Sequence, residues 1–488
     1  AGTNTFTGNT ANGLANDIHN MGTFTIASGE TTIDGGITGT GSFTVASGAT
    51  FNIGNTTIEQ GEFVLNGVLG VDVLSATQFG KVDADDISGS GTVKLNVASV
   101  GTYNIFGANN TFAVDAGKTF IATNNGASGI KVELKDAETL ATDAGISSQA
   151  ASVVSGLAQS GNANVQKISL AMQQALNAGD VETVEKETAK TAPTSKPVAQ
   201  AVASSVQNQI LTMTGKRMAA ISPVGRNGGD ALESAGVWVQ GMFNKSKLAD
   251  QFHGYTRGFA MGGDMLINND LTIGGGYSYS NADIHADARH TDVESNSIFV
   301  YGQYKPAEWY VNGTLTYTMS DYDEQTQMLG GELTAQFDVD AYGAQFMTGY
   351  DFASGLTPEV GIRYLHVSQD AYDNGLVSSD ELDGDYLSGV AGVKYAFDIA
   401  NDWGMMLRPE LRAGVTYDFL SDANDITVVM PGAPAYVLAG DRLSRMGGEF
   451  GIGMTTEYRG VQVSLNYDLT VHEDYTSQTG MVKFRYDF

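Results

Sequence analysis

The chain has 488 residues, of which 55 are acidic and 26 are basic, and its formal net charge at pH 7 is −29. A charge of this sign repels phosphate backbones and excludes nucleic acid as a partner class. Cysteine is absent, which excludes disulfides and thiolate metal or redox sites. The first residues contain neither a charged nor an apolar leader segment, so we expect that any signal peptide has been removed. Abundant glycine, tyrosine and phenylalanine with only eight prolines favour an all-β fold.

The first predicted domain, residues 1–135, contains a repeat. The stretch "GTFTIASGETTI" at Gly22 returns as "GSFTVASGATFNI" at Gly41 and more loosely as "GEFVLNGVLGV" at Gly61. Each copy alternates apolar residues and ends in a Ser-Gly or Asn-Gly turn signal. Stacked coils of about 20 residues bury an apolar face that one coil cannot bury alone, so the repeat predicts a parallel β-solenoid. A small β-sandwich with accidental internal similarity is the alternative.

The second predicted region, residues 136–197, is rich in alanine, serine and glutamine. Its apolar residues recur at helical spacing, and glycines near Gly161 and Gly179 bound the predicted helix. One face of this helix carries Val165, Ile168, Met172 and Leu176. The following stretch, "DVETVEKETAKTAPTSKP", is charged and ends in proline, which predicts a linker.

The third predicted region, residues 198–230, contains a second helix over residues 198–220. Its side chains are small or polar around most of the circumference, with a thin apolar stripe of Val202, Val206 and Ile210. This helix has too little apolar surface to face lipid or to form a core, but it suits a narrow, water-lined channel. We therefore predict a pore-spanning helix that also includes Asn208.

The last predicted domain, residues 231–488, alternates apolar and polar residues in long runs, of which residues 461–472 are typical. Each run reaches the roughly 9–11 residues that a tilted strand needs to cross a bilayer. Twelve runs begin near Val237, Gly254, Leu271, Ser295, Trp309, Asp338, Leu356, Asp385, Trp403, Leu443, Val461 and Gly480. The even number predicts a 12-stranded antiparallel transmembrane β-barrel.

The connectors between these runs alternate in length. Five are short, such as "KPAE" at Lys305 and "RG" at Arg459, and they alternate with six longer ones, which include "DEQTQMLGGELTAQ" and "AYDNGLVSSDELDG". Short periplasmic turns and long external loops alternate in this way in membrane barrels. A soluble sandwich or solenoid has no reason to sort its loops by length, so the connectors favour a barrel.

In a membrane barrel the apolar residues of each strand face lipid and the polar ones face the lumen. Six charged residues then point inward: Glu359, Arg363, Arg408, Glu410, Arg412 and Arg485. These residues either contact a plug and set ion selectivity or pair with one another, and we favour pairing. Trp238, Trp309 and Trp403 lie near strand ends, as tryptophans of a membrane-interface belt would.

The chain ends in "VKFRYDF", in which Val482, Phe484, Tyr486 and Phe488 share one face of a strand. On the closing strand of a barrel these residues should face lipid, and the strand should pair with the first one near Val237. The aromatic residues at the C-terminus are therefore expected to lie on the lipid-facing surface of the barrel.

The whole arrangement resembles the autotransporters of type V secretion. In that family a β-solenoid passenger is followed by a helical linker and a 12-stranded translocator barrel that ends in an aromatic residue. The resemblance covers residues 22–135 as passenger, 198–220 as the pore-spanning helix and 237–488 as the barrel. It implies a protein of the bacterial outer membrane that displays its passenger at the cell surface. The passenger is shorter than is usual for the family.

The resemblance also implies partners and a processing step. It implies contact with outer-membrane lipid and lipopolysaccharide, with periplasmic chaperones, and with the barrel assembly machinery, which in this family recognises the C-terminal aromatic pattern. Some members cleave themselves at an Asn-Asn junction in the linker. Here Asn208 is followed by Gln209, so that motif is not matched and we expect the passenger to remain attached. The surface ligand of the passenger is not identified by the sequence.

We expect no enzyme, no catalytic residue and no cofactor. The sequence contains neither a GxSxG nor an HExxH motif. The glycine-rich stretch "GGGYSYS" at Gly274 lies in a predicted strand rather than before a helix. In "HADARH", His285 and His290 with Asp283, Asp287 and Asp292 nearby could ligate a divalent cation. We favour a solvated polar loop there and predict no metal site.

Two functions from different classes remain. In the first, the protein is a secretion device that displays a structural or adhesive, uncleaved passenger. In the second, it is a diffusion pore or a structural outer-membrane protein with an N-terminal β domain. A lumen filled by residues 198–220 should conduct poorly, so the predicted pore helix distinguishes the two.

Overall fold

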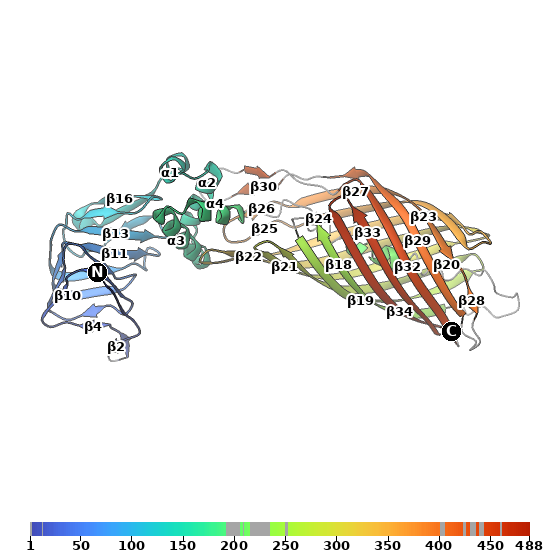
Figure 1. Ribbon diagram of the computed structural model, residues 1–488, viewed down its shortest axis with the longest axis horizontal. Coiled ribbons are helices and arrows are strands. Elements are labelled where there is room, and N and C mark those ends of the chain that lie inside the picture. Colours follow the sequence, from blue (N-terminus) through green and yellow to red (C-terminus); the bar gives the residue numbers. More distant parts are fainter. Residues whose placement is uncertain are drawn as a thin grey trace.

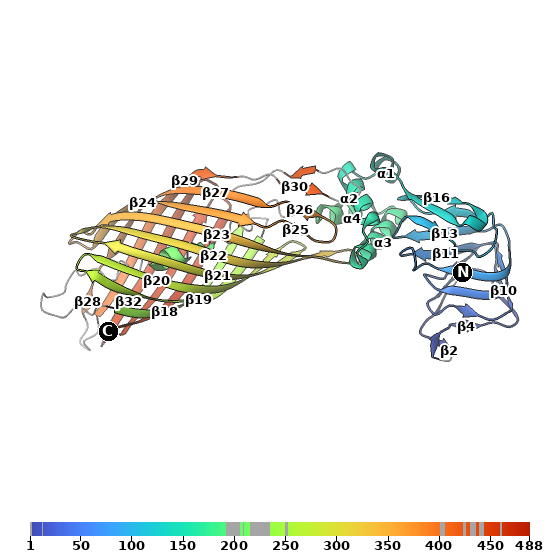
Figure 2. The same ribbon diagram turned by 180° about the vertical axis from the view of Figure 1, so that it is seen from behind.

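The computed structural model describes residues 2–11, 13–191, 205–207, 209–214, 235–248, 252–400, 406–422, 426–429, 436–438, 444–458 and 461–488. The molecule is elongated, with a stack of strands at one end, a group of helices in the middle and a barrel at the other end (Figure 1). The view from behind shows the same order (Figure 2). Among the described residues no helix has the length and apolar character needed to cross a membrane.

The N-terminal stack is built mainly from short parallel strands, which confirms the predicted β-solenoid. The strands are β1 (Thr3–Phe6), β2 (Thr10–Ala11), β3 (Leu14–Ala15), β4 (Ile18–His19), β5 (Thr23–Ile26), β6 (Gly29–Ile33), β7 (Ile37–Thr38), β8 (Ser42–Val45), β9 (Ala49–Asn52), β10 (Thr57–Leu65), β11 (Val68–Val73), β12 (Lys81–Ser88), β13 (Thr92–Val97), β14 (Gly101–Tyr103), β15 (Ala113–Asp115), β16 (Phe120–Asn124) and β17 (Ile130–Leu134). Two parallel sheets run along the stack, and β14, β16 and β17 close it with antiparallel pairs.

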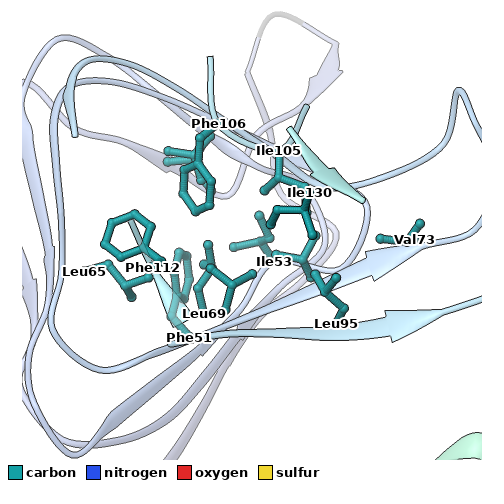
Figure 3. Packing of buried hydrophobic residues seen from close by; sticks show 14 of the residues in the cluster. Phe51, Ile53, Leu65, Leu69, Val73, Leu95, Ile105, Phe106, Phe112 and Ile130 are labelled. Atoms are coloured by element: carbon teal, nitrogen blue, oxygen red, sulfur yellow. The ribbon is translucent and has the colours of Figure 1, made fainter. Parts of the chain in front are cut away.

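The sequence repeat sets the register of the stack. Phe24 pairs with Phe43 and Phe43 with Phe63, so equivalent residues of successive copies lie one above the other. Their ring centroids are 5.2 and 6.0 Å apart. The interior of the coils is mainly apolar, as the packing of the buried side chains shows (Figure 3), with a buried hydrogen bond between Asn20 and Gln60.

The repeated glycines have a steric cause. A Cβ atom at Gly41 would lie 2.3 Å from the carbonyl oxygen of Gly22, and one at Gly61 would lie 2.6 Å from that of Thr40. Neither distance leaves room for a side chain. Glycine at the start of the second and third copies therefore lets neighbouring coils approach within hydrogen-bonding distance, whereas a Cβ at Gly22 of the first copy would meet nothing within 4 Å.

Four helices follow the solenoid: α1 (Ala137–Ala144), α2 (Ser148–Gln159), α3 (Ala163–Ala178) and α4 (Val181–Ala189). The four apolar residues predicted for one face are all buried in α3, which ends at Gly179 in the left-handed conformation. The expected linker was wrong in its first half, because Val181–Ala189 is helical. Asp180 caps this helix, and hydrogen bonds from the Thr183 side chain and backbone lower the pKa of the Asp180 carboxyl.

The barrel consists of twelve antiparallel strands among the described residues, as predicted. They are β18 (Ala235–Leu248), β19 (Phe252–Asn268), β20 (Leu271–Ala286), β21 (Arg289–Tyr304), β22 (Trp309–Met328), β23 (Gly331–Tyr350), β24 (Leu356–Gln369), β27 (Leu382–Ala396), β29 (Met406–Ser421), β32 (Met446–Tyr458), β33 (Val461–His472) and β34 (Tyr475–Asp487). β18 pairs with β34 and β27 with β29, which closes the cylinder. The short strand β28 (Ile399–Ala400) pairs with β29, and a separate small sheet contains β25 (Tyr372–Asp373), β26 (Ser378–Ser379), β30 (Ile426–Val429) and β31 (Tyr436–Leu438).

The expectation of a long loop at residues 323–336 was wrong. β22 and β23 are 20 residues long each and turn tightly at Leu329 and Gly330. The alternating pattern continues past the membrane zone because Met328 and Leu333 pack among the helices. Likewise "HADARH" is part of the β20–β21 hairpin rather than a loop. The predicted strand starts at Trp403 and Leu443 lie outside the described residues, as does the turn at Arg459.

The helices are seated on the end of this long hairpin. Their core contains Met328 and Leu333 from the hairpin together with Ile168 of α3. The Leu329 backbone N–H donates to Glu187 Oε2 at 2.7 Å. On the solenoid side, the Lys118 N–H donates to Asn177 Oδ1 at 2.9 Å. The helices thus connect the solenoid to one end of the barrel, opposite the end where Phe488 lies (Figure 1).

Candidate functional site

The inner wall of the barrel is lined by small hydroxyl and amide side chains along β20 to β22. Hydroxyl pairs bridge neighbouring strands, for example Ser297 and Thr318 at 2.8 Å and Ser295 and Ser320 at 2.8 Å. The opposite parity of these strands is apolar and exposed. This is the inverted polarity of a membrane barrel, in which apolar side chains face lipid and polar ones face the lumen.

A helical segment occupies the lumen, and residues 205–207 and 209–214 of it are described. The Thr316 hydroxyl of β22 contacts Gln207 by a hydrogen bond, and the hydroxyls of Thr214 and Thr314 lie 3.1 Å apart. Both wall residues are on β22, so the segment is fixed to one strand at two heights. Of the residues predicted for the pore helix, Val206 and Ile210 are buried in the lumen, whereas Val202 and Asn208 lie outside the described residues.

The apolar side of the segment packs on an apolar patch of the wall. Ile210, Val206 and Met213 are buried together with Trp238 and Phe299. The Trp238 ring stacks on Phe299 with centroids 6.0 Å apart, and its indole N–H donates to the Tyr301 hydroxyl at 3.0 Å. The assignment of Trp238 to the membrane belt was therefore wrong, because its side chain points into the lumen and is 4% exposed.

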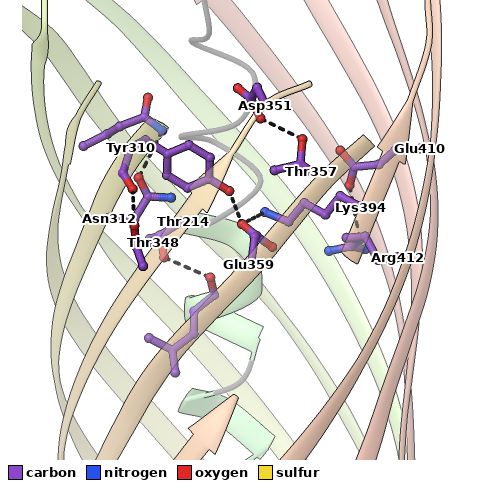
Figure 4. Close-up of polar contacts among 12 residues, drawn as sticks. Thr214, Tyr310, Asn312, Thr348, Asp351, Thr357, Glu359, Lys394, Glu410 and Arg412 are labelled. Carbon is purple, nitrogen blue, oxygen red and sulfur yellow. Dashed lines mark hydrogen bonds and ion pairs between the residues drawn. The ribbon is translucent and has the colours of Figure 1, made fainter. Parts of the chain in front are cut away.

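The other side of the lumen carries the predicted charges in ion pairs. Glu359 accepts from the Tyr310 hydroxyl and the Lys394 ammonium group, as Figure 4 shows. Arg363 lies 2.9 Å from Glu449. Some of these partners were not singled out by the sequence pattern, such as Lys394 on the neighbouring strand β27 and Glu449 on β32, which is not adjacent to β24.

Arg412 of β29 forms ion pairs with two carboxylates of the inner wall. Its guanidinium lies 3.2 Å from Glu410 and contacts Asp468 of β33. Arg408, nearer the strand end, is 3.8 Å from Asp398 in a pair that is largely exposed. The charges of the wall near the helical segment are therefore ion-paired, whereas the pair of Arg408 near the strand end is longer and more exposed.

Arg485 forms a separate buried pair on the closing strand. Its guanidinium donates to both oxygens of Asp264 at 3.1 and 3.2 Å, a bidentate geometry, and also contacts Asp487. Tyr301 donates to Asp264 at 2.8 Å and accepts from Trp238, which extends the network to the apolar patch. Asp264 was not among the predicted residues, although its polar parity on β19 was a signal that could have identified it.

Little space remains beside the helical segment. The described residues line cavities of about 130 and 70 Å³ between Leu211 and the charged wall. Small-molecule sites typically measure about 300–1,000 Å³. The lumen with its helical segment is therefore arranged as a filled channel rather than as a ligand pocket.

Two contacts mark the positions of the chain before and after the segment in the lumen. The carbonyl of Lys190 accepts from the Arg289 guanidinium at 3.3 Å, at the end of the barrel where the helices lie. β18 begins at Ala235 at the opposite end, where Gly236 pairs with Asp487. Residues 205–207 and 209–214, which lie in the lumen, fall between these two points in the sequence.

The C-terminal residues lie on the outer surface. β34 pairs with β18 and β33, and the Phe488 N–H donates to the Ala235 carbonyl at 3.0 Å. The outward side chains Val482, Phe484, Tyr486 and Phe488 are all exposed, with Phe488 at 60%. They form a lipid-facing row on the strand that closes the barrel.

Residues 237–468 match the family model of the autotransporter β-domain. Outer membrane protein A of Rickettsia conorii is 26% identical over 324 residues, 59% of this chain and 16% of that protein. Outer membrane protein B of Rickettsia typhi is 24% identical over 297 residues, 54% of this chain and 18% of that protein. The chain thus spans less than a fifth of the length of these relatives.

Solved barrels of the same kind are also similar to this chain. The translocator domain of autotransporter NalP from Neisseria meningitidis matches 60% of this chain and 100% of its own, with 18% identity and a TM-score of 0.47. The β domain of the Bordetella autotransporter BrkA matches 52% of this chain and 100% of its own, with 16% identity and a TM-score of 0.42.

Proposed function

Because the chain belongs to the autotransporters, outer-membrane proteins with a surface passenger, we propose that its barrel carries its own solenoid, residues 1–135, across the outer membrane and anchors it there. The proposal assigns export and anchoring to three predicted regions: the helical linker region 136–197, the pore-helix region 198–230 and the barrel region 231–488. Export ends with the linker in the lumen and the passenger outside.

The observation that supports this function most directly is the helical segment in the lumen. A diffusion pore needs an open channel, whereas here Gln207 and Thr214 are bonded to β22 and Ile210 packs on Trp238. The polar contacts involve small hydroxyl and amide groups, which interact weakly and exchange readily with water. A wall of this kind suits a chain that slides through before it comes to rest.

We further propose that the passenger stays attached and has a structural or adhesive role rather than a catalytic one. Its coils offer two long sheet faces, and the helices that follow are fastened to the β22–β23 hairpin through Met328, Leu333 and Glu187. Gels of outer membranes that carry the chain should then show the full-length band without a separate barrel band. The partners in this proposal are outer-membrane lipid and lipopolysaccharide, periplasmic chaperones, the assembly machinery and a surface ligand of the solenoid.

The test is the ion conductance of the full chain and of a variant that lacks residues 198–220, each in planar lipid bilayers. The full chain should conduct poorly, because the segment fills the lumen, and the deletion should raise the single-channel conductance several-fold. Retention of heat-modifiable migration on gels controls for a folded barrel in both proteins. An intact chain that already conducts like the deletion variant would favour the diffusion pore instead.

A further inference from the structure

A cluster of imidazole and carboxylate groups lies on the outer face of the β20–β21 hairpin. His285 of β20 and His290 of β21 are directly opposite each other, two residues from each side of the turn at Asp287 and Ala288. Asp283 lies on the same face of β20. One ligand atom from each of Asp283, His285 and His290 falls within 4.8 Å of the others.

The distances within the cluster match those between the ligands of a small metal ion. Zinc binds imidazole nitrogen at about 2.0–2.1 Å, so two ligands at tetrahedral corners lie roughly 3.3–3.4 Å apart. The Nδ1 atoms of His285 and His290 are 3.3 Å apart, and His290 Nδ1 is 3.4 Å from Asp283 Oδ1. Asp283 Oδ1 lies 3.0 Å from His285 Nε2 rather than beside Nδ1, so the three groups can meet one cation after the His285 side chain reorients, without movement of the strands.

Two neighbouring carboxylate oxygens support this geometry. Asp283 Oδ1 is shielded from solvent and accepts no hydrogen bond among the described residues, although His285 Nε2 lies 3.0 Å away. Such an oxygen usually has a partner. Asp292 Oδ2 lies 3.3 Å from His290 Nε2, on the far side of the ring from Nδ1. A histidine that binds metal through one nitrogen commonly donates its other N–H to a carboxylate. Asp292 is positioned to accept that hydrogen bond from His290.

The cluster lies above the lipid-facing zone of the barrel. On the outward parity of the same strands, Phe259 of β19 and Ile298 of β21 are exposed apolar residues nearer the opposite end. Towards the hairpin tip this parity becomes polar, through Asp292 and Asp283. His253 of β19 pairs with His285, and their rings lie 5.2 Å apart, so a third imidazole borders the cluster. The site is therefore accessible to ions in the water outside the membrane.

We propose that this hairpin binds one zinc ion through His285, His290 and Asp283, with its remaining coordination position open to solvent. Two imidazoles and one carboxylate are a donor set that suits zinc and similar transition-metal ions, whereas calcium and magnesium prefer oxygen ligands. Bound zinc links β20 to β21 beyond the membrane. It thereby stiffens the end of the barrel next to the β22–β23 hairpin, which contacts the helices.

The experiment is calorimetric titration of the full folded chain, in detergent and without a polyhistidine tag, with zinc chloride and separately with calcium chloride. We expect one zinc ion to bind per chain. Calcium should not bind at the same site. Mutation of residues that only orient a metal ligand typically lowers metal affinity by about 10–100-fold. H290Q removes a ligand itself, so it should weaken zinc binding by at least about tenfold.

The matched control is H366Q. His366 also lies on the outer face and pairs with an acid, Asp385 at 2.9 Å, but it has no second imidazole opposite. Zinc affinity should be unchanged in H366Q. The proposal is overturned if the intact chain binds no zinc, or if H285Q and H290Q, both heat-modifiable on gels, bind zinc as tightly as H366Q does.

Discussion

At the scale of the residue, the buried ion pair of Arg485 and Asp264 shows how the barrel accommodates charge inside its wall. Their side chains are 5% and 3% exposed, and each is held by more than one hydrogen bond. A buried charge that loses its partner is much more costly than an exposed one, because water cannot replace the lost contacts. The pair at Arg408 and Asp398, 38% and 46% exposed, provides the contrast within the same barrel.

We expect Arg485→Gln to lower the free energy of unfolding by about 3–5 kcal/mol, since the buried Asp264 carboxylate would lose its bidentate ion pair. Denaturant unfolding of the folded chain in detergent micelles, followed by tryptophan fluorescence, measures this change, because Trp238 belongs to the same network. Arg408→Gln should change the free energy by less than about 1 kcal/mol. Equal effects of the two substitutions would show that the buried network adds no stability of its own.

At the scale of the element, the β22–β23 hairpin acts as the seat of the helices. Its turn at Gly330 has φ +89°, and a Cβ there would lie 2.7 Å from the Ala171 Cβ and 2.9 Å from the Lys167 carbonyl oxygen. The turn therefore fits against α3 only because residue 330 lacks a side chain. Beyond the lipid-facing zone, the apolar residues of the hairpin pack against the helices instead of facing lipid.

We expect Gly330→Val to detach the helices from the hairpin while the barrel remains folded. The substitution adds a clash with α3 to a left-handed backbone cost of about 1–2 kcal/mol. Limited trypsin digestion should then cut faster at Lys167 and Lys186, with heat-modifiable migration of the barrel unchanged.

Gly145→Ala is the matched control for this experiment. Gly145 also has a positive φ, +71°, but a Cβ there would meet nothing within 4 Å. It therefore reports the backbone cost alone and should affect digestion much less. If Gly330→Val leaves trypsin cleavage at the level of the control, the hairpin does not hold the helices.

At the scale of the whole molecule, the barrel closes only when the last strand, β34, pairs with the first, β18. β34 pairs with β18 along its length, and Phe488 completes the row of outward aromatic residues at the end where both strands meet. Among the described residues, the solenoid core contains none from the barrel. Assembly of the barrel and folding of the passenger should therefore respond separately to changes at the C-terminus.

We expect deletion of Phe488 to lower the amount of heat-modifiable barrel in outer membranes several-fold while the solenoid folds as before. The deletion removes one backbone hydrogen bond and one lipid-facing ring from the closing strand. Phe488→Tyr, which retains both, should assemble normally. Protease resistance of the solenoid reports its fold in each variant. Normal insertion of the deleted chain would contradict a role of Phe488 in assembly.

Several parts of this fold and site followed from local patterns, and others did not. The repeat at Gly22 and Gly41 predicted the register of the solenoid, because stacking of equivalent residues is what a repeat encodes. Strand parity placed Glu359 and Arg485 inside the barrel. Position near a strand end was misleading for Trp238, because an aromatic residue there can face the lumen when a helix covers it.

The sequence by itself determined the order of solenoid, helices and 12-stranded barrel, since each has its own period of apolar residues. Only the tertiary structure decided which charges pair, how far the β22–β23 hairpin extends and that His285 faces His290. Those outcomes depend on contacts between strands and helices that are distant in sequence, for which a one-dimensional pattern carries no register. The interior of the barrel is therefore where the sequence predicts least, because every contact there joins separate segments.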